Sequence, residues 1–432
     1  MGRLYYQFIR TTDFGPYVTK LILAMPRAVE NRELGVEKFS VYVEIKDRNG
    51  DVVKLPKSFI ERDEFVPSVG YRKILMAYTS DRQGIACDMA SRYVTLELAY
   101  GPTYKCSSAL AADFTNINGH ENFTINDYVI TQTQDIGEGD NVIRGLVFDS
   151  CAGIKHPQRE RFIDVDSEDE TKLLRYGYYT PDLNTGKRPL IVWLHGAGEG
   201  GDETAIAYAG NKVTELTEDW IQKKFDGAFV LVPQCPTMWL DDGSGQYGDS
   251  GKSKYVKVLK ATIDSFIARF SDVIDTDKIY IGGDSNGGFM TMRMIIDYPQ
   301  FFAAAFPICE ALIDSAISDA DIEAIKNIPI WFTHAKNDPI VPPENYVVPT
   351  YERLVKAGAS DLHFTYWDKI VDRKSYCDKY EGFLDEAGNP FEYLGHFAWI
   401  PMLNDDCKVD FDGKPVVVNG KEVTLLDWLA LH

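Results

Sequence analysis

Residues 283–287 read GDSNG, the Gly-x-Ser-x-Gly pattern of a nucleophile elbow with Ser285 at its centre. An apolar run at 279–281 precedes the pentapeptide and an apolar-faced segment at 289–296 follows it, so the sequence predicts a strand entering the turn and a helix leaving it. Such a turn strains the backbone of the serine, and the flanking glycines avoid side-chain clashes there. The pattern alone recurs by chance in many chains, so the alternative is a glycine-rich loop with an incidental serine. The predicted strand and helix favour a nucleophilic serine.

A serine hydroxyl is a poor nucleophile at neutral pH and needs a base, which in turn needs an acid to orient it. After an elbow of this kind the acid comes next along the chain and the histidine comes last. Asp338 suits the acid, because it follows the apolar run 330–333 in a turn that Pro339 fixes, although it could also be a turn cap. His396 suits the base, because it lies beside Gly395 in a loop after the last predicted strand.

The other histidines from residue 334 onward have plainer expected roles. His363 falls inside the alternating strand predicted at 362–367, and His334 precedes the acid at the end of a strand, so both are expected to pack structurally. His432 is the last residue and is expected to be frayed.

The segment 195–198, HGAG, follows the apolar run 190–194 and could stabilise an oxyanion. Its glycines let the backbone approach a tetrahedral intermediate, and the N–H groups of Ala197 and Asn286 are expected to be the two donors. The alternative is an ordinary glycine-rich turn. No Walker pattern is present, which argues against a phosphate-binding loop of that type.

Three further residues follow predicted strands on the same edge and could line a substrate pocket: Glu199, Trp239 and Glu310. Trp239 could stack on an aromatic acyl group or a sugar. It could equally be a buried loop anchor, and the sequence leaves both readings open.

The elements that must position these residues lie in 145–432, where strands and helices alternate. Continuous apolar runs such as 190–194 and 228–232 are typical of strands buried on both faces of a parallel sheet. Between them, apolar residues recur at the helical period from 256 to 270. This rhythm predicts a catalytic α/β domain with a doubly wound, mostly parallel sheet.

Residues 1–135 have a different rhythm, with short alternating runs separated by turns and no convincing amphipathic helix. Asn49-Gly50 between two such runs predicts a hairpin, because this pair accepts the positive φ of a tight turn. We expect an all-β, immunoglobulin-like sandwich here. The polar, glycine-containing stretch 136–144 is expected to be a linker between the two domains.

Five ordered segments resemble a family of bacterial carboxylesterases related to feruloyl esterases, polyhydroxyalkanoate depolymerases and the catalytic domain of prolyl oligopeptidases: WLHGAGEGG, PQCPTMW, GGDSNGG, FTHAKNDPIVP and YLGHFAWI. Some members carry an N-terminal immunoglobulin-like domain. The resemblance implies an α/β-hydrolase fold, a triad of Ser285, Asp338 and His396, and an oxyanion hole at Ala197 and Asn286. One departure is Asp284, where relatives often have a small or thiol residue. A carboxylate there could alter the titration of the base if it points inward.

Composition limits the partners. The formal charge is −20, from 65 acidic and 45 basic residues, which argues against nucleic acid and anionic membranes. Seven cysteines are scattered without metal-ligand spacing, so we expect free thiols, no metal and no cofactor. The first residues show no signal peptide, which favours the cytoplasm, although a chain from which a leader had been removed would look the same.

The expected activity is hydrolysis of short-chain or aromatic esters, with feruloyl and acetyl-carbohydrate esters among them, through an acyl-enzyme. Two alternatives stay open at this stage. One is a serine peptidase similar to prolyl oligopeptidase, although about 135 residues cannot form the propeller that such enzymes usually carry. The other is a carbohydrate-binding protein with an inert hydrolase domain. For the first domain, ligand binding and contact between subunits of a homo-oligomer are both open.

Overall fold

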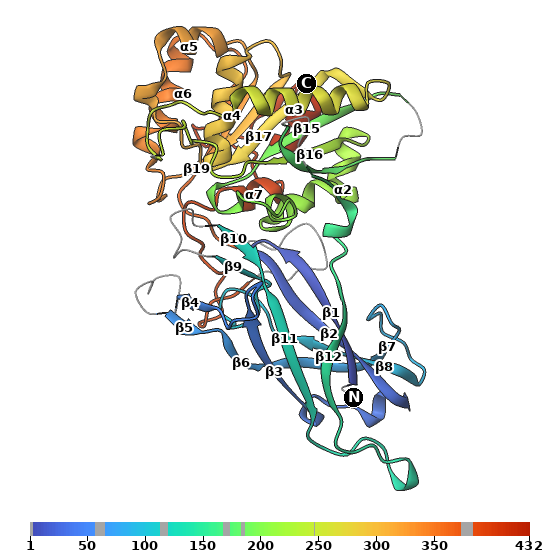
Figure 1. Cartoon of the computed structure of the whole chain (residues 1–432). Coiled ribbons are helices and arrows are strands. Elements are labelled where there is room, and N and C mark those ends of the chain that lie inside the picture. Colours follow the sequence, from blue (N-terminus) through green and yellow to red (C-terminus); the bar gives the residue numbers. More distant parts are fainter. Residues whose placement is uncertain are drawn as a thin grey trace. The chain divides into compact units, whose positions relative to one another are not determined.

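The computed structural model describes residues 3–56, 65–112, 120–166, 173–182, 186–245, 247–372 and 383–432. The chain forms two compact units, shown in Figure 1. The first comprises Met1–Asp113 and Glu121–Glu160, and the second comprises Phe114–His120 and Arg161–His432. Within the described ranges, no helix is long and apolar enough to cross a bilayer.

The described part of the first unit is all-β apart from short 3-10 turns, as predicted. Its strands are β1 (Arg3–Thr12), β2 (Gly15–Val29), β3 (Phe39–Lys46), β4 (Lys54–Pro56), β5 (Phe65–Pro67), β6 (Val69–Arg72), β7 (Ile74–Ser80), β8 (Ser91–Leu98), β9 (Leu110–Ala112), β10 (Glu121–Phe123), β11 (Ile125–Gln132) and β12 (Val147–Lys155). The hydrogen-bonded order of the main sheet is β6-β3-β11-β12-β1-β2-β8-β7. In β3, buried and half-buried residues alternate, because successive side chains of a strand point to opposite faces.

This sheet closes over its own core. Residues of β3 and β8, which lie toward opposite ends of the strand order, share one hydrophobic cluster. Arg72 at the end of β6 reaches across the core, where its guanidinium donates to the carbonyls of Val18 and Ala99 and to the hydroxyl of Tyr128. The two halves of the sheet therefore pack face to face, which is the arrangement of a sandwich.

The predicted boundary between the domains is wrong. The stretch 136–144, expected to be a linker, is the tip of a hairpin between β11 and β12: Ile136 and Ile143 form a bridge and are buried in the sandwich core. β12 then pairs with β1 and β11, so the first unit extends to Glu160. Glycine, aspartate and asparagine suit both linkers and hairpin tips, so composition could not separate the two.

The second unit is the doubly wound α/β domain that the sequence predicts. Its main sheet has the order β13-β14-β16-β15-β17-β18-β19-β20, in which β13–β14 and β14–β16 are antiparallel and the other pairs are parallel. The strands are β13 (Ile163–Val165), β14 (Arg175–Tyr179), β15 (Arg188–Leu194), β16 (Phe229–Gln234), β17 (Ile274–Asp284), β18 (Ala304–Ile308), β19 (Ile330–Ala335) and β20 (Leu362–Trp367), with a small ribbon of β21 (Val417–Val418) and β22 (Lys421–Glu422). The helices are α1 (Ile206–Ala209), α2 (Asp219–Gln222), α3 (Val256–Arg269), α4 (Asn286–Asp297), α5 (Asp319–Ile325), α6 (Val347–Lys356), α7 (Trp399–Leu403) and α8 (Leu425–Leu431).

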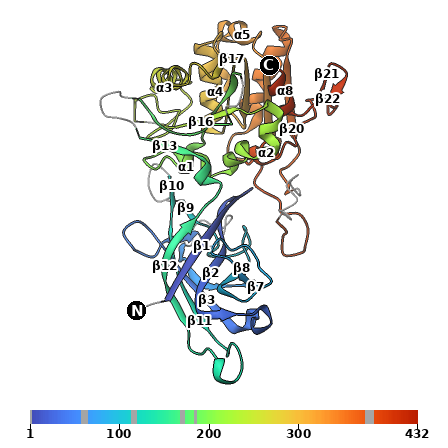
Figure 2. The same ribbon diagram turned by 90° about the vertical axis from the view of Figure 1, so that its right-hand side faces the viewer.

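Helices cover both faces of this sheet (Figure 2). On one face, α3 to α6 pack against a core cluster that includes Phe332 of β19. On the other, the neighbouring residue Trp331 meets Trp428 of α8 edge to face, with ring centroids 5.6 Å apart. Because both faces are buried, the central strands are continuously apolar, which is the pattern that made them recognisable in the sequence.

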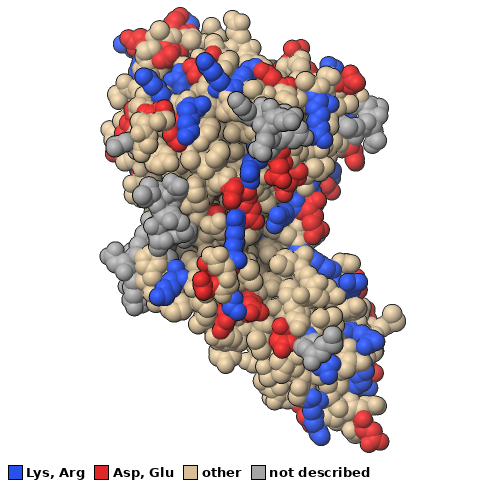
Figure 3. All heavy atoms as spheres, viewed as in Figure 1, with Lys and Arg blue, Asp and Glu red and all other residues tan. Residues whose placement is uncertain are grey.

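On the face in Figure 3, acidic and basic side chains are interspersed rather than gathered into one patch of a single sign. Six of the seven cysteines lie in the described ranges, and these six form no disulfide.

Candidate active site

Ser285 lies at the sharp turn between β17 and α4. Its φ and ψ are 54° and −112°, a conformation that L-residues rarely adopt, and its N–H donates to the carbonyl of Ile308 at 2.9 Å. This is the strained elbow that the Gly-x-Ser-x-Gly pattern predicts. The turn lifts the side chain beyond the carboxyl end of the strand, where it stays partly exposed.

The glycines beside the elbow are required by the end of the neighbouring strand β15. A Cβ atom at position 283 would lie 2.2 Å from the carbonyl oxygen of Leu194, and one at position 287 would lie 1.9 Å from the same atom. The obstacle is backbone, so it cannot rotate away. The glycines therefore allow the elbow and the oxyanion segment to approach closely.

We expect Gly287→Ala to destabilise the protein by about 3 kcal/mol or more, because relieving the contact with Leu194 would require the backbone to move. Thermal unfolding measures the effect. Gly248→Ala is the matched control, because that glycine is exposed and its added Cβ would meet no atom within 4 Å. Equal unfolding midpoints for the two variants would contradict this account of the elbow.

Ser285, His396 and Asp338 meet although they are far apart in sequence. The Nε2 atom of His396 lies 2.8 Å from the hydroxyl oxygen of Ser285. Its Nδ1 atom lies 2.8 Å from Oδ2 of Asp338. Each residue follows a different strand, namely β17, β20 and β19, so the shared edge of the sheet brings the three together.

Asp338 is buried and accepts several hydrogen bonds. The N–H groups of Ile340 and Val341 donate to its Oδ1, and the rings of His334 and His396 contact its Oδ2. Burial alone would raise the pKa of this carboxyl, but these bonds and the charge of a protonated His396 hold the pKa well below its usual range. Asp338 is therefore ionised and can orient the base.

The second imidazole on the acid is a feature that the sequence reading did not anticipate. His334 is fully buried at the end of β19, as expected, but its Nε2 lies 3.0 Å from Oδ2 of Asp338 and 3.0 Å from the carbonyl oxygen of Val341. A proton on Nε2 serves both acceptors. The sequence signal for this contact was the four-residue spacing between His334, at the end of the strand, and Asp338, in the turn that follows it.

Ala197 and Asn286, the two expected oxyanion donors, each begin a helical segment after a strand of the main sheet. Ala197 begins a 3-10 turn (Ala197–Glu199) after β15, and Asn286 begins α4. The first N–H of a helical turn has no acceptor within that turn, so both amides can donate to a substrate. The side chain of Asn286 has another task, since its Oδ1 accepts the N–H of Trp239 at 2.6 Å.

Trp239 is a loop anchor, the second of its two predicted roles. It is fully buried in the domain core, its indole N–H donates to the carbonyl of His195, and its ring meets Tyr255 edge to face. Glu199 and Glu310 are also buried, with 4% and 0% of their surfaces exposed. The structure therefore places all three expected pocket residues around the elbow without exposing them to solvent.

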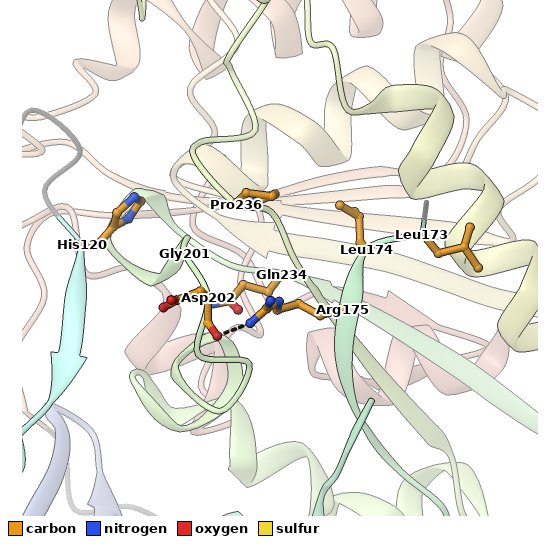
Figure 4. A pocket seen from close by; sticks show the side chains of 8 residues that line it. All are labelled: His120, Leu173, Leu174, Arg175, Gly201, Asp202, Gln234 and Pro236. Carbon is orange, nitrogen blue, oxygen red and sulfur yellow. Dashed lines mark hydrogen bonds between the residues drawn. The ribbon is translucent and has the colours of Figure 1, made fainter. Parts of the chain in front are cut away.

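A cavity of about 350 Å³ lies at the same edge of the sheet (Figure 4). Its walls are His120, Leu173, Leu174, Arg175, Gly201, Asp202, Gln234 and Pro236. Gln234 ends β16, which is separated from β17 by β15 alone, and its Nε2 donates to the carbonyls of Glu199 and Glu203. Its buried Oε1 has no hydrogen-bond partner among the described residues, so this wall offers an acceptor to a bound donor.

Glu310 follows β18 and packs against the first turn of α4. One oxygen accepts the N–H of Leu312 at 2.8 Å, while Oε1 has no partner among the described residues. Burial raises the pKa of this carboxyl to about 8, so it holds its proton at neutral pH. The unfolded chain releases that proton near pH 4.3. The contribution of Glu310 to stability is therefore present below that pH and is lost as the pH rises toward 8.

Glu310→Gln should remove this dependence, because the amide does not titrate. We compare the unfolding midpoint of the variant with that of the unsubstituted protein at two pH values. The difference, variant minus unsubstituted protein, should be at least ~3 °C larger at pH 8 than at pH 5. Glu344→Gln, at an exposed position, is the control and should show no such change. If the midpoints of Glu310→Gln and of the unsubstituted protein instead change equally with pH, the Glu310 carboxyl is ionised in the folded protein.

Comparisons with known proteins agree with this architecture. Residues 5–143 match the family model of the esterase Ig-like N-terminal domain, and residues 184–366 match that of the phospholipase/carboxylesterase family. The crystal structure of a thermostable esterase is 26% identical, with a TM-score of 0.70 over 92% of this chain and 95% of that one.

Curated relatives match over shorter stretches. Feruloyl esterase B of Neurospora crassa is 29% identical over 137 residues, which cover 30% of this chain and 42% of that protein. A probable acetylxylan esterase A of Neosartorya fischeri is 31% identical over 141 residues, which cover 31% of this chain and 33% of that protein. This chain thus spans less than half the length of either curated relative. Together with the elbow, the sheet order and the all-β first unit, these matches show that the chain joins an esterase Ig-like N-terminal domain, over residues 5–143, to a domain of the phospholipase/carboxylesterase family, over residues 184–366.

Proposed function

We propose that this protein is a serine carboxylesterase that acts through an acyl-enzyme. The observation that carries the proposal is the continuous hydrogen-bond relay from the Ser285 hydroxyl through His396 to Asp338, with both contacts at 2.8 Å. A strained serine, a base within hydrogen-bond reach and an ionised acid behind that base are the components that serine nucleophilic catalysis requires.

In the first half of the reaction, Nε2 of His396 takes the proton of Ser285 as its oxygen attacks the ester carbonyl. The oxyanion that forms accepts hydrogen bonds from the N–H groups of Ala197 and Asn286. Asp338 stabilises the imidazolium through Nδ1. Collapse of the tetrahedral intermediate breaks the ester C–O bond, and His396 gives its proton to the leaving alkoxide.

In the second half, His396 removes a proton from water, and the resulting hydroxide attacks the acyl group on Ser285. The same two amides hold the second oxyanion. Release of the carboxylic acid returns the proton to the serine oxygen. Each half-reaction uses the base once and restores it, so the site needs no other proton carrier.

The substrate class that we propose is an ester with a short or aromatic acyl group, feruloyl and acetyl-carbohydrate esters included. Two relatives support it by name, a feruloyl esterase and a probable acetylxylan esterase.

The test is a panel of p-nitrophenyl acetate, p-nitrophenyl butyrate, methyl ferulate and a long-chain p-nitrophenyl ester, together with labelling by a fluorophosphonate probe. We expect turnover of the short or aromatic esters to exceed that of the long-chain ester, and the probe to modify Ser285. If the probe does not label Ser285 and no ester is hydrolysed, the serine esterase proposal is wrong. If only the long-chain ester is turned over, the proposed substrate class is wrong while the mechanism stands.

A further inference from the structure

Trp239 is hydrogen-bonded to both segments that carry the expected oxyanion donors. Its backbone N–H donates to Oδ1 of Asn286 at 2.6 Å, and its indole N–H donates to the carbonyl of His195 at 3.1 Å. Asn286 carries one expected donor on its own N–H, and His195 lies two residues before the other donor, Ala197. A single buried residue therefore connects the nucleophile elbow to the oxyanion segment.

The ring of His195 has a defined protonation state. The N–H of Cys235 donates to its Nε2 at 3.1 Å, so Nε2 carries no proton. Burial lowers the pKa of His195 to about 4, so the ring is neutral and its one proton is on Nδ1. Nδ1 lies 2.6 Å from the carbonyl oxygen of Gly196 and therefore donates a hydrogen bond to it.

The Gly196 carbonyl belongs to the same peptide group as the N–H of Ala197. A trans peptide group is planar, and its C=O and N–H bonds point in opposite directions. The bond from His195 holds this carbonyl on one side and thereby aims the Ala197 N–H to the other. Orientation matters for a donor, because a hydrogen bond weakens steeply as its angle departs from linear.

The packing of the two rings supports these bonds. The rings of His195 and Trp239 have centroids 5.1 Å apart at an interplanar angle of 40°, and Trp239 in turn meets Tyr255 edge to face at 6.0 Å. His195, Trp239 and Cys235 are fully buried. Because water does not reach these groups, it cannot replace a hydrogen bond that a substitution removes.

On the basis of the proposed esterase function, we propose that Trp239 and His195 are positioning residues that hold the two oxyanion amides at the separation and angle that the tetrahedral intermediate requires. Trp239 sets the separation, because it joins Asn286 to His195. His195 sets the angle of the Ala197 N–H. Both side chains are fully buried, so they act through the amides without touching the ester. We call this pair the Trp239–His195 bridge.

Trp239→Phe removes the indole donor and keeps an aromatic ring. We expect kcat for p-nitrophenyl butyrate to fall at least about tenfold, with KM changed less than about threefold, because the intermediate depends on the amides more than the bound ester does. Trp428→Phe is the matched control, since that tryptophan is also buried and its indole N–H donates to Asp361 at 2.9 Å. Both variants should have lower unfolding midpoints, but Trp428→Phe should keep its kcat.

His195→Ala and His195→Asn separate the orienting bond from the packing of the ring. The side-chain NH₂ of asparagine can replace Nδ1 as the donor to Gly196, whereas alanine has no donor. We expect kcat to fall about 100-fold in His195→Ala, which is the scale of a lost oxyanion donor. His195→Asn should regain at least about tenfold of that loss. Equal kcat in the two variants would contradict the orienting role.

A trifluoromethyl ketone inhibitor distinguishes positioning from general loosening of the fold. The oxygen of Ser285 adds to the ketone carbon, the carbonyl π bond becomes an oxyanion on the two amides, and His396 takes the serine proton. The inhibition constant should rise in Trp239→Phe and His195→Ala by about the factor by which kcat/KM falls, because both quantities report stabilisation of the tetrahedral state. An unchanged inhibition constant in a slowed variant would overturn the bridge.

Two further measurements do not depend on turnover. Nitrogen NMR of histidine-labelled protein should show one neutral ring, at about pH 7, with a protonated Nδ1 and a bare Nε2, and His195→Asn should remove its signals. Amide hydrogen exchange over residues 195–197 should be faster in Trp239→Phe than in Trp428→Phe. A proton on Nε2 of His195, or equal exchange in the two variants, would overturn the bridge.

The outcomes distinguish the bridge from the proposed function. If turnover depends on Ser285 but Trp239→Phe matches Trp428→Phe in kcat and in inhibition, the bridge is wrong and the esterase stands. If the protein is inactive and unlabelled by the fluorophosphonate, the esterase is wrong. The tautomer of His195 and the exchange of residues 195–197 then still decide whether the bridge holds this segment.

Discussion

Ser285→Ala is expected to reduce kcat for p-nitrophenyl butyrate by about 10⁶-fold, since removing the nucleophile of a serine triad costs about that much. The physical reason is that Nε2 of His396 lies 2.8 Å from the serine oxygen and contacts no other hydroxyl in the part of the chain that the structure describes. The residual rate would come from the oxyanion amides and from substrate binding. Initial rates at saturating ester measure the loss.

The same variant should fold normally. Alanine at 285 faces the same strained backbone conformation as serine, so the unfolding midpoint should change little. Fluorophosphonate labelling should disappear at the same time. Turnover at the unsubstituted rate by a folded, unlabelled Ser285→Ala protein would mean that hydrolysis occurs elsewhere in the molecule.

Asp338→Asn is expected to lower kcat about 10⁴-fold, the scale found when the acid of a serine triad becomes an amide. An asparagine that keeps its oxygen toward the N–H groups of Ile340 and Val341 turns its NH₂ toward the two imidazoles. His396 must then expose an unprotonated Nδ1 to the amide and carry its proton on Nε2. In that tautomer it cannot accept the proton of Ser285.

His334→Ala tests whether this loss comes from the tautomer of His396 or from general disturbance around the acid. The substitution removes one contact of Asp338 but leaves the contact with His396. We expect kcat to fall no more than about 100-fold, which is the scale of a lost hydrogen bond to a charged group. If His334→Ala were as inactive as Asp338→Asn, the second imidazole would have a catalytic role that the relay does not give it.

The α/β domain could be predicted from the sequence because its determinants are local. Strands buried on both faces are continuously apolar, and α3 and α4 show the helical period. The order of the serine, the acid and the base along the chain then assigned each to the end of a particular strand. The end of the first unit was misplaced for the opposite reason, since the pairing of β12 with β1 joins residues nearly 150 positions apart and leaves no local pattern.

By itself, the sequence determined which residue types follow which strand, and therefore the nucleophile elbow and the candidates for acid, base and oxyanion donors. The tertiary structure alone decided what those residues contact. It placed His334 on the acid, turned Trp239 into the core, and buried Asp284 beside Gly196. Strand order sets which strand ends become neighbours, and the direction and burial of the side chains then fix the contacts across those ends. Spacing along the chain records neither the strand order nor these contacts.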